Sequence, residues 1–280
     1  MSNNKKILTI QDISCYGQCS TTVALPILSA FGFETAILPS AILSTHTSGF
    51  TDYTVLDLTD EMPKIIEHWK SEHIQFDCIY TGYVANAKQF EYIKQAKEYL
   101  LKDDGLFIVD PAMADNGEMY PGLDIDIISG MIDLCSMADY ILPNVTEACL
   151  MTRYDYAIYQ DDDYINGLIS ELVGLGAKNI IITGIQDDEY SIGCVAYDGL
   201  TKTTIIKEKI EKSYHGTGDI FSSLMVAYIN KGMDIKGAID FSTDFIYDAI
   251  ENTLDDQFHE YGVKYEPLIK EYLNKKDPRY

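Results

Sequence analysis

The segment with the clearest chemical content is Tyr214–Asp219, with the sequence YHGTGD, which is followed by the apolar run Ile220–Ile229. Gly216 and Gly218 have no Cβ, so the backbone can turn tightly there and a ligand can come close. We expect a loop that leads directly into a buried helix. The first amide groups of a helix have no internal partner and carry partial positive charge. The backbone of Gly216, Thr217 and Gly218 is therefore a predicted anion site.

Asp219 falls in the first turn of this predicted helix, where the helix dipole stabilises a carboxylate and the side chain can accept a proton beside a bound anion. An anion cradle next to a general base is what phosphoryl transfer to a hydroxyl requires. The alternative is an ordinary glycine loop with a plain helix-start residue, because short glycine motifs have a high false-positive rate. The other motifs of the chain are needed to distinguish the two interpretations.

The composition limits the possible partners. The 280 residues include 44 acidic and 21 basic side chains, and the formal net charge of −23 argues against nucleic acid and against an anionic membrane surface. Only two arginines occur, Arg153 and Arg279. A phosphate site must therefore rely on backbone amides, lysines and bound metal cations rather than on arginine forks.

Cysteine spacing and hydropathy indicate the compartment. Six cysteines occur and none forms a C-x-x-C pair; Cys15 and Cys19 are four apart, but no matching Cys/His pair follows, which disfavours zinc. The sequence contains no signal-peptide pattern and no apolar run of membrane-spanning length. We expect free thiols and a reducing, cytoplasmic setting.

Strands and helices alternate along most of the chain, which predicts an α/β fold with a mostly parallel sheet and helices on both faces. The predicted strands are Lys6–Ile10, Glu34–Leu38, Asp77–Tyr80, Leu106–Val109, Tyr140–Leu142 and Asn179–Ile182, followed by a hairpin of Tyr190–Tyr197 and Thr203–Lys209 around Asp198 and Gly199. The predicted helices are Val23–Phe31, with Pro26 near its first turn, Asp60–Glu72, Asn86–Leu101, Asp124–Cys135, Thr146–Met151, Asp161–Gly174, the helix that ends at Asn230, Lys236–Asn252 and Tyr265–Leu273. Gln11–Thr22 and Ser40–Thr54 are predicted polar connections. No repeat or linker divides the chain, so residues 1–280 are interpreted as one domain.

Polar residues follow the predicted strands, and ligands of open parallel sheets bind beyond the carboxyl ends of the strands. These residues are Gln11 and Asp12, Thr81–Tyr83, Asp110, Asn144, Thr183 and finally Gly216–Asp219. They supply acids, hydroxyls and amides but no arginine. Such a set suits a metal-bound polyphosphate next to a small polar substrate, because Mg²⁺ takes one or two carboxylates together with phosphate oxygens and water.

Several of these residues have a structural alternative. Asn144 and Glu147 are three apart at a helix start, the spacing of a capping box, and this reading is compatible with a cation site. Asp115 is followed by Asn116 and Gly117, which favours a turn. Thr183 is equally explained as a strand end. His46, alone in a polar loop, is on its own evidence more typical of a solvated histidine, and Tyr83 is one of 21 tyrosines.

Six motifs in the same order resemble the pyridoxal kinase branch of the ribokinase-like superfamily. The matching segments are Lys6–Gln11 with Gly17, Ser44–Phe50, Thr81–Tyr83, Val109–Gly117, Leu142–Ala148 and Gly216–Asp219. Each motif is weak alone, but their common order covers most of the chain. The resemblance implies a ribokinase-like three-layer sandwich and an ATP-dependent kinase that phosphorylates the hydroxymethyl group of a vitamin B6 vitamer.

The resemblance also implies a role for each motif. Asp219 would take the hydroxymethyl proton, and the amides of Gly216, Thr217 and Gly218 would hold the transferring phosphoryl group. Asn144 and Glu147 would organise Mg²⁺ and its water, while Asp110, Asp115 and Thr183 would line the nucleotide and cation side, with Asp110 also near the metal. His46, Thr47 and Tyr83 would face the pyridine ring. ATP, Mg²⁺ and a homodimer are what the family implies, and a monovalent cation is a further candidate cofactor.

Three positions depart from the family pattern. Asp12 stands where these kinases often have serine, Thr45 where they have asparagine, and Ala114 where they have glycine. A serine hydroxyl can bond a ring nitrogen, whereas a carboxylate would favour a protonated nitrogen or repel an anionic substrate. These changes bear on the form of the substrate more than on the reaction.

Other functions stay open at this level. A hydroxymethylpyrimidine kinase of the same superfamily is the nearest alternative, although relatives of that branch often carry cysteine where this chain has Asp219. A sugar or nucleoside kinase usually has a larger lid than the segment between Phe33 and Asp77 allows. A non-catalytic vitamin-binding regulator would be favoured by loss of the base or the glycine pair, and both are present.

Overall fold

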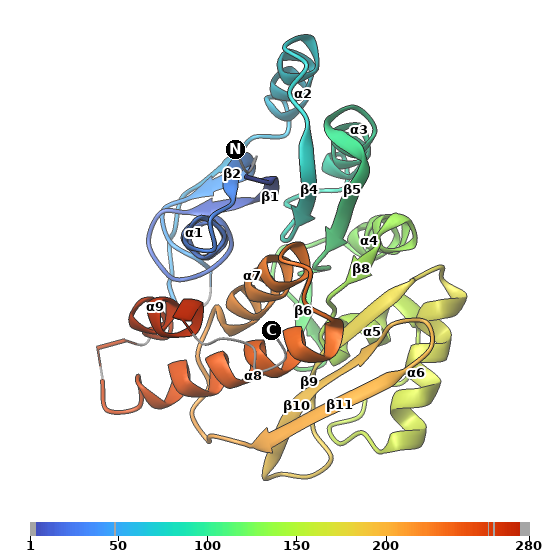
Figure 1. Cartoon of the computed structure of the whole chain (residues 1–280), viewed down its shortest axis with the longest axis vertical. Coiled ribbons are helices and arrows are strands. Elements are labelled where there is room, and N and C mark those ends of the chain that lie inside the picture. The colour runs from blue at the N-terminus through green and yellow to red at the C-terminus, as the bar shows by residue number, and fades with distance from the viewer. Residues whose placement is uncertain (1–3, 48, 257, 260, 275–280) are drawn as a thin grey trace.

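A nine-stranded sheet forms the middle of the molecule in the computed structural model, which describes residues 4–47, 49–256, 258–259 and 261–274 (Figure 1). Its order is β11-β10-β9-β8-β5-β4-β1-β2-β3. The strands are β1 (Lys6–Ser14), β2 (Glu34–Leu43), β3 (Val55–Asp57), β4 (Phe76–Thr81), β5 (Leu101–Val109), β8 (Tyr140–Ile141), β9 (Asn179–Ile185), β10 (Ser191–Tyr197) and β11 (Lys202–Glu208). The six strands from β9 to β2 pair in parallel, and β3, β10 and β11 are antiparallel.

Helices cover both faces of this sheet, because successive side chains of a buried strand point to opposite sides. One apolar core joins the sheet to α2 (Met62–Ser71), α3 (Gln89–Leu100), α4 (Asp126–Met137), α5 (Val145–Thr152) and α6 (Asp162–Gly174). The other joins it to α1 (Thr21–Ala30), α7 (Thr217–Asn230), α8 (Ile235–Glu251) and α9 (Glu266–Asn274). In β4, Ile79 belongs to the first core and Tyr80 to the second. The predicted three-layer α/β fold is confirmed.

Helix α7 is the most deeply enclosed element of the second core. Every residue from Ile220 to Asn230 is buried, which agrees with a sequence that is apolar around the whole helix. Figure 1 shows α7 between α1 and α8. The helix is therefore held on several sides, and its first turn projects toward the carboxyl ends of the central strands.

Three predicted strand boundaries were wrong because backbone pairing continues through polar sequence. Strand β5 begins at Leu101 and not at Leu106. Strand β1 extends to Ser14, so Gln11 and Asp12 lie in a strand and not in a connection. Strand β2 extends to Leu43, and β3 then pairs with it antiparallel, so only part of Ser40–Thr54 is a loop. The pairing of β1 with β4 ends at Ile10, whereas its pairing with β2 continues. Ladder hydrogen bonds are made by the backbone, and polar side chains do not prevent them.

Pro26 lies inside α1 and not in its first turn, which also differs from the prediction. A proline in a helix interior leaves the carbonyl four residues earlier without its usual donor. That carbonyl belongs to Thr22, and the hydroxyl of Tyr265 donates to it at 3.4 Å. The contact from a distant part of the chain thus compensates the missing backbone bond.

No helix within the described residues has the length and apolar character needed to cross a membrane. The six cysteines all lie among the described residues and are free thiols, as predicted.

Gly193 offers a test of the β10–β11 pairing. A Cβ at this position would lie 1.8 Å from the carbonyl oxygen of Ile205, a backbone atom that cannot move without breaking the ladder. We expect Gly193→Ala to lower the free energy of unfolding by about 1–3 kcal/mol, the usual cost of overpacking. Urea denaturation measures it.

Gly174, the last residue of α6, provides the matched control because a Cβ there would meet nothing within 4 Å. Gly174→Ala should leave stability unchanged or raise it by up to about 1 kcal/mol. Equal effects of the two substitutions would contradict the assigned packing of β10 against β11.

Candidate active site

The predicted anion site lies at the start of α7. Gly216 is the N-cap residue, with φ +79°, and no side chain caps the helix. A Cβ on Gly216 would lie 1.7 Å from the carbonyl oxygen of Gln18. Only glycine therefore leaves room for the loop after β1, which contains Gln18, to pack against the start of α7. Ile220 makes the first backbone bond of the helix, to Gly216. The amides of Thr217, Gly218 and Asp219 precede that bond and have no partner within the helix.

Asp219 is placed next to the end of β5. Its side chain is partly exposed, and the backbone N–H of Ser20 donates a hydrogen bond to it. Ser222, three residues later on the same face of α7, donates from Oγ to Asp110 Oδ2 at 2.7 Å. Asp110, which directly follows β5, is 8% exposed and interacts electrostatically with Asp219. Two carboxyl groups distant in sequence thus lie close enough to interact, one at the start of α7 and one at the end of β5.

Asn144 and Glu147 form the predicted capping box at the start of α5. Asn144 Oδ1 accepts from the amide of Glu147, and Glu147 Oε2 accepts from the amide of Asn144, both at 2.9 Å. Glu147 Oε1 also accepts from the amide of Met113 at 3.0 Å, and Asn144 Nδ2 donates to the carbonyl of Ala114 at 2.7 Å. The capping box therefore also holds the segment that follows Asp110.

The carboxylates of this region suppress one another's ionisation. Burial and the charge of Asp219 raise the pKa of Asp110 to about 8. Burial raises the pKa of Asp219 to about 7, with Asp12 adding to the shift and the Ser20 amide opposing it. Burial and the charge of Asp110 raise the pKa of Glu147 well above its usual range. None of the ion pairs found in the described part of the chain involves these side chains.

This arrangement fits a divalent cation that arrives with phosphate. The described residues contain no group of three or more His, Cys, Asp and Glu side chains that could hold a metal ion by themselves. Asp110 and the nearby Glu147 are buried carboxyl groups that form no ion pair among the described residues, and a bound cation would favour their ionised forms. Both oxygens of Glu147 already accept backbone amides, so Glu147 would reach a metal through a water. Mg²⁺ commonly takes one or two carboxylates, with phosphate oxygens and water completing the shell.

Asp115 and Thr183 lie at the border of this region. Asp115 is exposed and accepts from the amide of Asn116 at 2.8 Å, within the short hairpin of β6 (Ala114–Asp115) and β7 (Glu118–Met119). Asn116 and Gly117 have φ values of +51° and +82°, so the predicted turn is confirmed. Thr183 pairs by a parallel bridge with Asn144, which brings β9 next to the capping box. The nucleotide-binding roles of Asp115, Asn144 and Thr183 stay predictions.

Two of the predicted ring-side residues, His46 and Tyr83, lie near Asp12, close to the first turn of α7. Asp12 is 4% exposed and interacts electrostatically with His46, Tyr83 and Asp219. The ring of His46 is buried and lies 5.6 Å from the ring of His215, measured between centroids. Thr47, next to it, is exposed, and Ser48 of the same segment lies outside the described residues.

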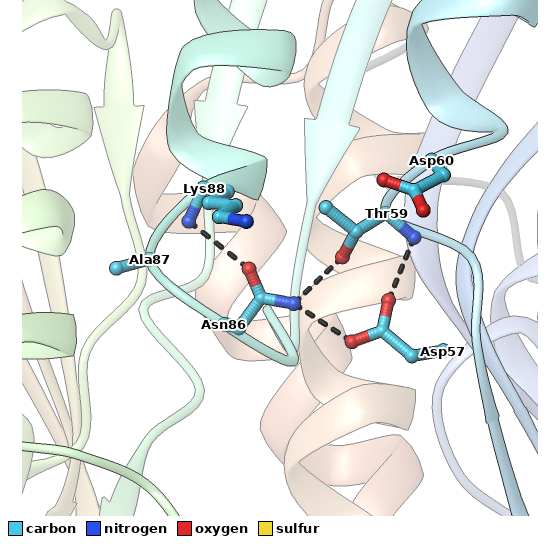
Figure 2. A pocket seen from close by; sticks show the side chains of 6 residues that line it. All are labelled: Asp57, Thr59, Asp60, Asn86, Ala87 and Lys88. Atoms are coloured by element: carbon cyan, nitrogen blue, oxygen red, sulfur yellow. Dashed lines mark hydrogen bonds between the residues drawn. The ribbon is translucent and has the colours of Figure 1, made fainter.

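Tyr83 is positioned by a network of hydrogen bonds behind it. Ser40 Oγ donates to the carbonyl of Tyr83 at 3.3 Å, and the buried Gln89 side chain donates to the carbonyl of Ser40 at 2.9 Å. Figure 2 shows the adjoining part of the network, in which the amide of Asn86 donates to Thr59 and Asp57. Asn86, Thr59 and Asp57 line a pocket of about 420 Å³, together with Asp60, Ala87 and Lys88.

A second pocket, of about 310 Å³, lies near the turn after Asp115 and includes Gly117, Thr146 and Arg153 in its lining. Neither of these two pockets is lined by Asp12, Asp110 or Asp219. The size of a pocket therefore does not identify the candidate active site. The site is identified by the neighbouring carboxyl groups and by the amides of α7 that have no partner within the helix.

Three contributors to the site were missed by sequence reasoning. Ser222 had a detectable signal, because it lies three residues after Asp219 and an i, i+3 spacing brings side chains together on a helix. Ser14 and Ser20 bond the side chain of Asp12, but they had no signal of this kind, since both lay in a segment interpreted as a polar connection. Ser14 reaches Asp12 because β1 extends to Ser14, and Ser20 reaches it because the loop after β1 folds back toward the strand.

Comparisons with known proteins place this geometry in a family. The sequence profile of phosphomethylpyrimidine kinase matches residues 27–263. The chain belongs to the phosphomethylpyrimidine kinase family. A crystal structure of a family protein from Bacteroides thetaiotaomicron, in an orthorhombic form with pyridoxal, is 33% identical, has a TM-score of 0.91 and matches over 96% of both chains.

Curated relatives of this kinase family carry two different activities in their names. Pyridoxal kinase of Dictyostelium discoideum is 24% identical over 266 residues, which covers 89% of this chain and 86% of that protein. Hydroxymethylpyrimidine/phosphomethylpyrimidine kinase of Haemophilus influenzae is 29% identical over 261 residues, which covers 91% of this chain and 94% of that protein. The predicted relationship to pyridoxal kinases is confirmed, and the chain is a kinase of this family, whose relatives divide between the two substrates.

Asp110 provides a test of the crowded carboxylates through the pH dependence of stability. Its pKa in the folded protein, about 8, lies above the ordinary value of 3.8, so between these pH values the folded state keeps a proton that the unfolded state releases. Stability must therefore fall as pH rises through this window. Asp110→Asn removes this contribution and keeps an acceptor for Ser222. We expect the melting temperature of the variant, relative to the parent, to rise from pH 5 to pH 8 without nucleotide or metal.

Asp104→Asn, at an exposed position of β5, is the matched control and should show no such pH trend. A difference between Asp110→Asn and the parent that stays constant from pH 5 to pH 8 would contradict the raised pKa of Asp110.

Proposed function

We propose that this chain transfers the γ-phosphoryl group of ATP to the hydroxymethyl group of a vitamin B6 vitamer. The observation that carries the proposal is the first turn of α7, where backbone amides without a partner in the helix lie beside the Asp219 carboxyl group and next to Asp110. The 33% identical structure with pyridoxal supports a pyridine substrate. ATP as donor, Mg²⁺ as cofactor, a homodimer and a cytoplasmic setting belong to the proposal, as the family resemblance implies.

The reaction follows from the position of each group. The Asp219 carboxylate accepts the proton of the substrate hydroxyl, and the hydroxyl oxygen forms a bond to the γ-phosphorus. The bond between that phosphorus and the bridging oxygen breaks, and ADP leaves with the electron pair. The amides at residues 217–219 would stabilise the charge on the transferring group, because the first amides of a helix have no partner within it and carry partial positive charge. Mg²⁺, when bound, supplies positive charge to the phosphate oxygens, and Asp110 and Glu147 would hold it directly and through water.

The raised pKa of Asp219, about 7, matches the role of a base. A general base is most effective when its pKa lies near the working pH, since it must be ionised and still attract a proton. Ionisation requires pH above that value in the free protein. The rate at low substrate concentration should therefore rise with pH through about 7.

A hydroxymethylpyrimidine is the second candidate substrate, favoured by the family profile and by relatives such as the Haemophilus influenzae protein. Both candidates present a hydroxymethyl group on a small nitrogen heterocycle, so the same base and anion site would serve either. The deciding experiment measures ADP release from Mg-ATP with pyridoxal, pyridoxamine, pyridoxine and hydroxymethylpyrimidine side by side. Turnover only with the pyrimidine would overturn the B6 proposal and keep the mechanism.

Asp219→Asn tests the base. The amide has nearly the same shape and still accepts a hydrogen bond from Ser20, but it cannot take up the hydroxyl proton. We expect the substrate affinity to stay close to that of the parent and kcat to fall by roughly 10²–10⁴-fold, as for loss of a general base. Steady-state kinetics and a binding titration measure the two effects.

Asp240→Asn, on the exposed face of α8, removes one carboxylate away from the site and should leave kcat unchanged. A parent-like kcat in Asp219→Asn would remove Asp219 from the role of base. The residual activity of Asp219→Asn should also lack the rise through pH 7 seen with the parent.

A further inference from the structure

The residue that joins the loop after β1 to helix α1 has an unusual backbone conformation. Ser20 is the N-cap residue of α1, with φ +48° and ψ −131°. These angles lie close to those of the first central residue of a type II′ turn, a position that favours glycine because a Cβ is strained there. Ser20 is 6% exposed, so the strained residue lies inside the protein. Such residues persist only where the surrounding structure holds them, and they are concentrated at functional sites.

Helix capping does not explain the serine at this position. A serine at an N-cap commonly accepts a hydrogen bond from an amide of the first turn, but the Ser20 side chain makes no such bond. The Ser20 carbonyl begins α1 by accepting from the amide of Ala24 at 2.9 Å, a bond that any residue type could make. The side chain is instead a hydrogen-bond partner of the buried Asp12 carboxyl group. The hydroxyl therefore serves a contact outside the helix.

The backbone amide of Ser20 is directed to the first turn of α7, where it donates a hydrogen bond to the Asp219 carboxyl group. The packing of the loop agrees with this contact, because a Cβ on Gly216 would lie 1.7 Å from the carbonyl oxygen of Gln18 and 3.7 Å from the Cα of Cys19. The loop thus touches the start of α7 immediately before Ser20. A carboxyl oxygen accepts from an N–H whether the group is ionised or neutral, so the contact does not depend on the charge of Asp219.

The backbone angle of Ser20 decides where its amide points. On the loop side, Thr22 Oγ1 lies 2.7 Å from the carbonyl oxygen of Cys19 and 3.0 Å from that of Gly17, which ties the loop to the first turn of α1. The φ angle of Ser20 sets how the preceding peptide group is turned relative to α1. A return to an ordinary negative φ would therefore rotate the amide of Ser20 away from Asp219.

We propose that Ser20 is a positioning residue for the base: its hydroxyl, bonded to Asp12, holds the strained backbone that directs its amide to the Asp219 carboxyl group. The inference rests on the proposed function, because it takes Asp219 as the base. Ser20 acts through Asp219 and not on the reacting atoms. Loss of the arrangement should therefore lower kcat and leave KM nearly unchanged, since the binding of both substrates does not require an oriented base.

The first test compares Ser20→Ala with Ser20→Gly in steady-state kinetics, using the substrate that the parent phosphorylates. Both substitutions remove the hydroxyl, but only alanine keeps the Cβ that strains the backbone. We expect kcat of Ser20→Ala to fall by roughly 10- to 100-fold, because a misplacement of about 1 Å can cost about 10²-fold in rate. Ser20→Gly should stay within a few-fold of the parent, since glycine adopts this conformation without support from the hydroxyl. Ser29→Ala, at the exposed end of α1, is the matched control and should change neither kcat nor KM.

A double substitution shows whether the effect passes through Asp219. In the Asp219→Asn background the base is absent, so adding Ser20→Ala should lower kcat by no more than a few-fold. A further loss as large as that in the parent background would mean that Ser20 acts elsewhere. Equal losses of kcat in Ser20→Ala and Ser20→Gly, or a parent-like kcat in Ser20→Ala, would also overturn the inference.

A measurement without turnover separates this inference from the proposed function. If the parent phosphorylates none of the four candidate substrates, the proposed function is wrong, and exchange of the residue 20 amide proton with solvent, followed by NMR, still tests the contact. We expect the amide to be protected in the parent and in Ser20→Gly, and its protection to fall by roughly tenfold or more in Ser20→Ala and in Asp219→Ala, which lacks the acceptor. Equal exchange in all four proteins would contradict the positioning of Asp219 by Ser20.

Discussion

Buried carboxyl groups without a protein counterion are the constraint on which this site depends. Asp12, Asp110 and Glu147 are buried at the carboxyl ends of the central strands, and the partly exposed Asp219 faces them from α7. A carboxylate taken out of water is costly unless a cation or several donors compensate it. Here the compensation inside the chain comes from hydroxyls and backbone amides. The ionised forms of these carboxyl groups are therefore favoured by a bound cation, which under the proposed function a metal-bound nucleotide would bring to Asp110 and Glu147.

The fold makes this concentration of charge possible because it holds the acids rigidly from opposite sides. Helix α7 is buried along nearly its whole length, so Asp219 cannot move away from Asp110 without disturbing the second apolar core. On the other side, the capping box of α5 ties Glu147 to the segment after Asp110. Repulsion between acids held close together lowers the stability of a protein. Active sites commonly tolerate this loss, because their function requires the acids to be close.

The parts of the fold and of the candidate site that depend on a single local motif could be predicted from the sequence. The glycines before Asp219, the spacing of Asn144 and Glu147 and the Asn116-Gly117 turn each specify their own backbone geometry, and each was located correctly. The alternation of strands and helices was sufficient for the layer arrangement. What local patterns cannot supply is the pairing of distant segments. The extension of β1 past β4 depends on β2 as a partner, and for that reason Gln11 and Asp12 were assigned to a loop.

The same distinction explains why a structural and a functional interpretation of one motif can both be correct. Asn144 and Glu147 satisfy each other's backbone amides as a capping box does, and by the same bonds Glu147 becomes a buried carboxylate near Asp110. The capping bonds fix the position of the Glu147 carboxyl group. Burial and the neighbouring Asp110 then raise its pKa. Asp12 is the reverse case: no local motif requires a carboxylate in β1, where hydroxyl donors and a neighbouring acid surround it.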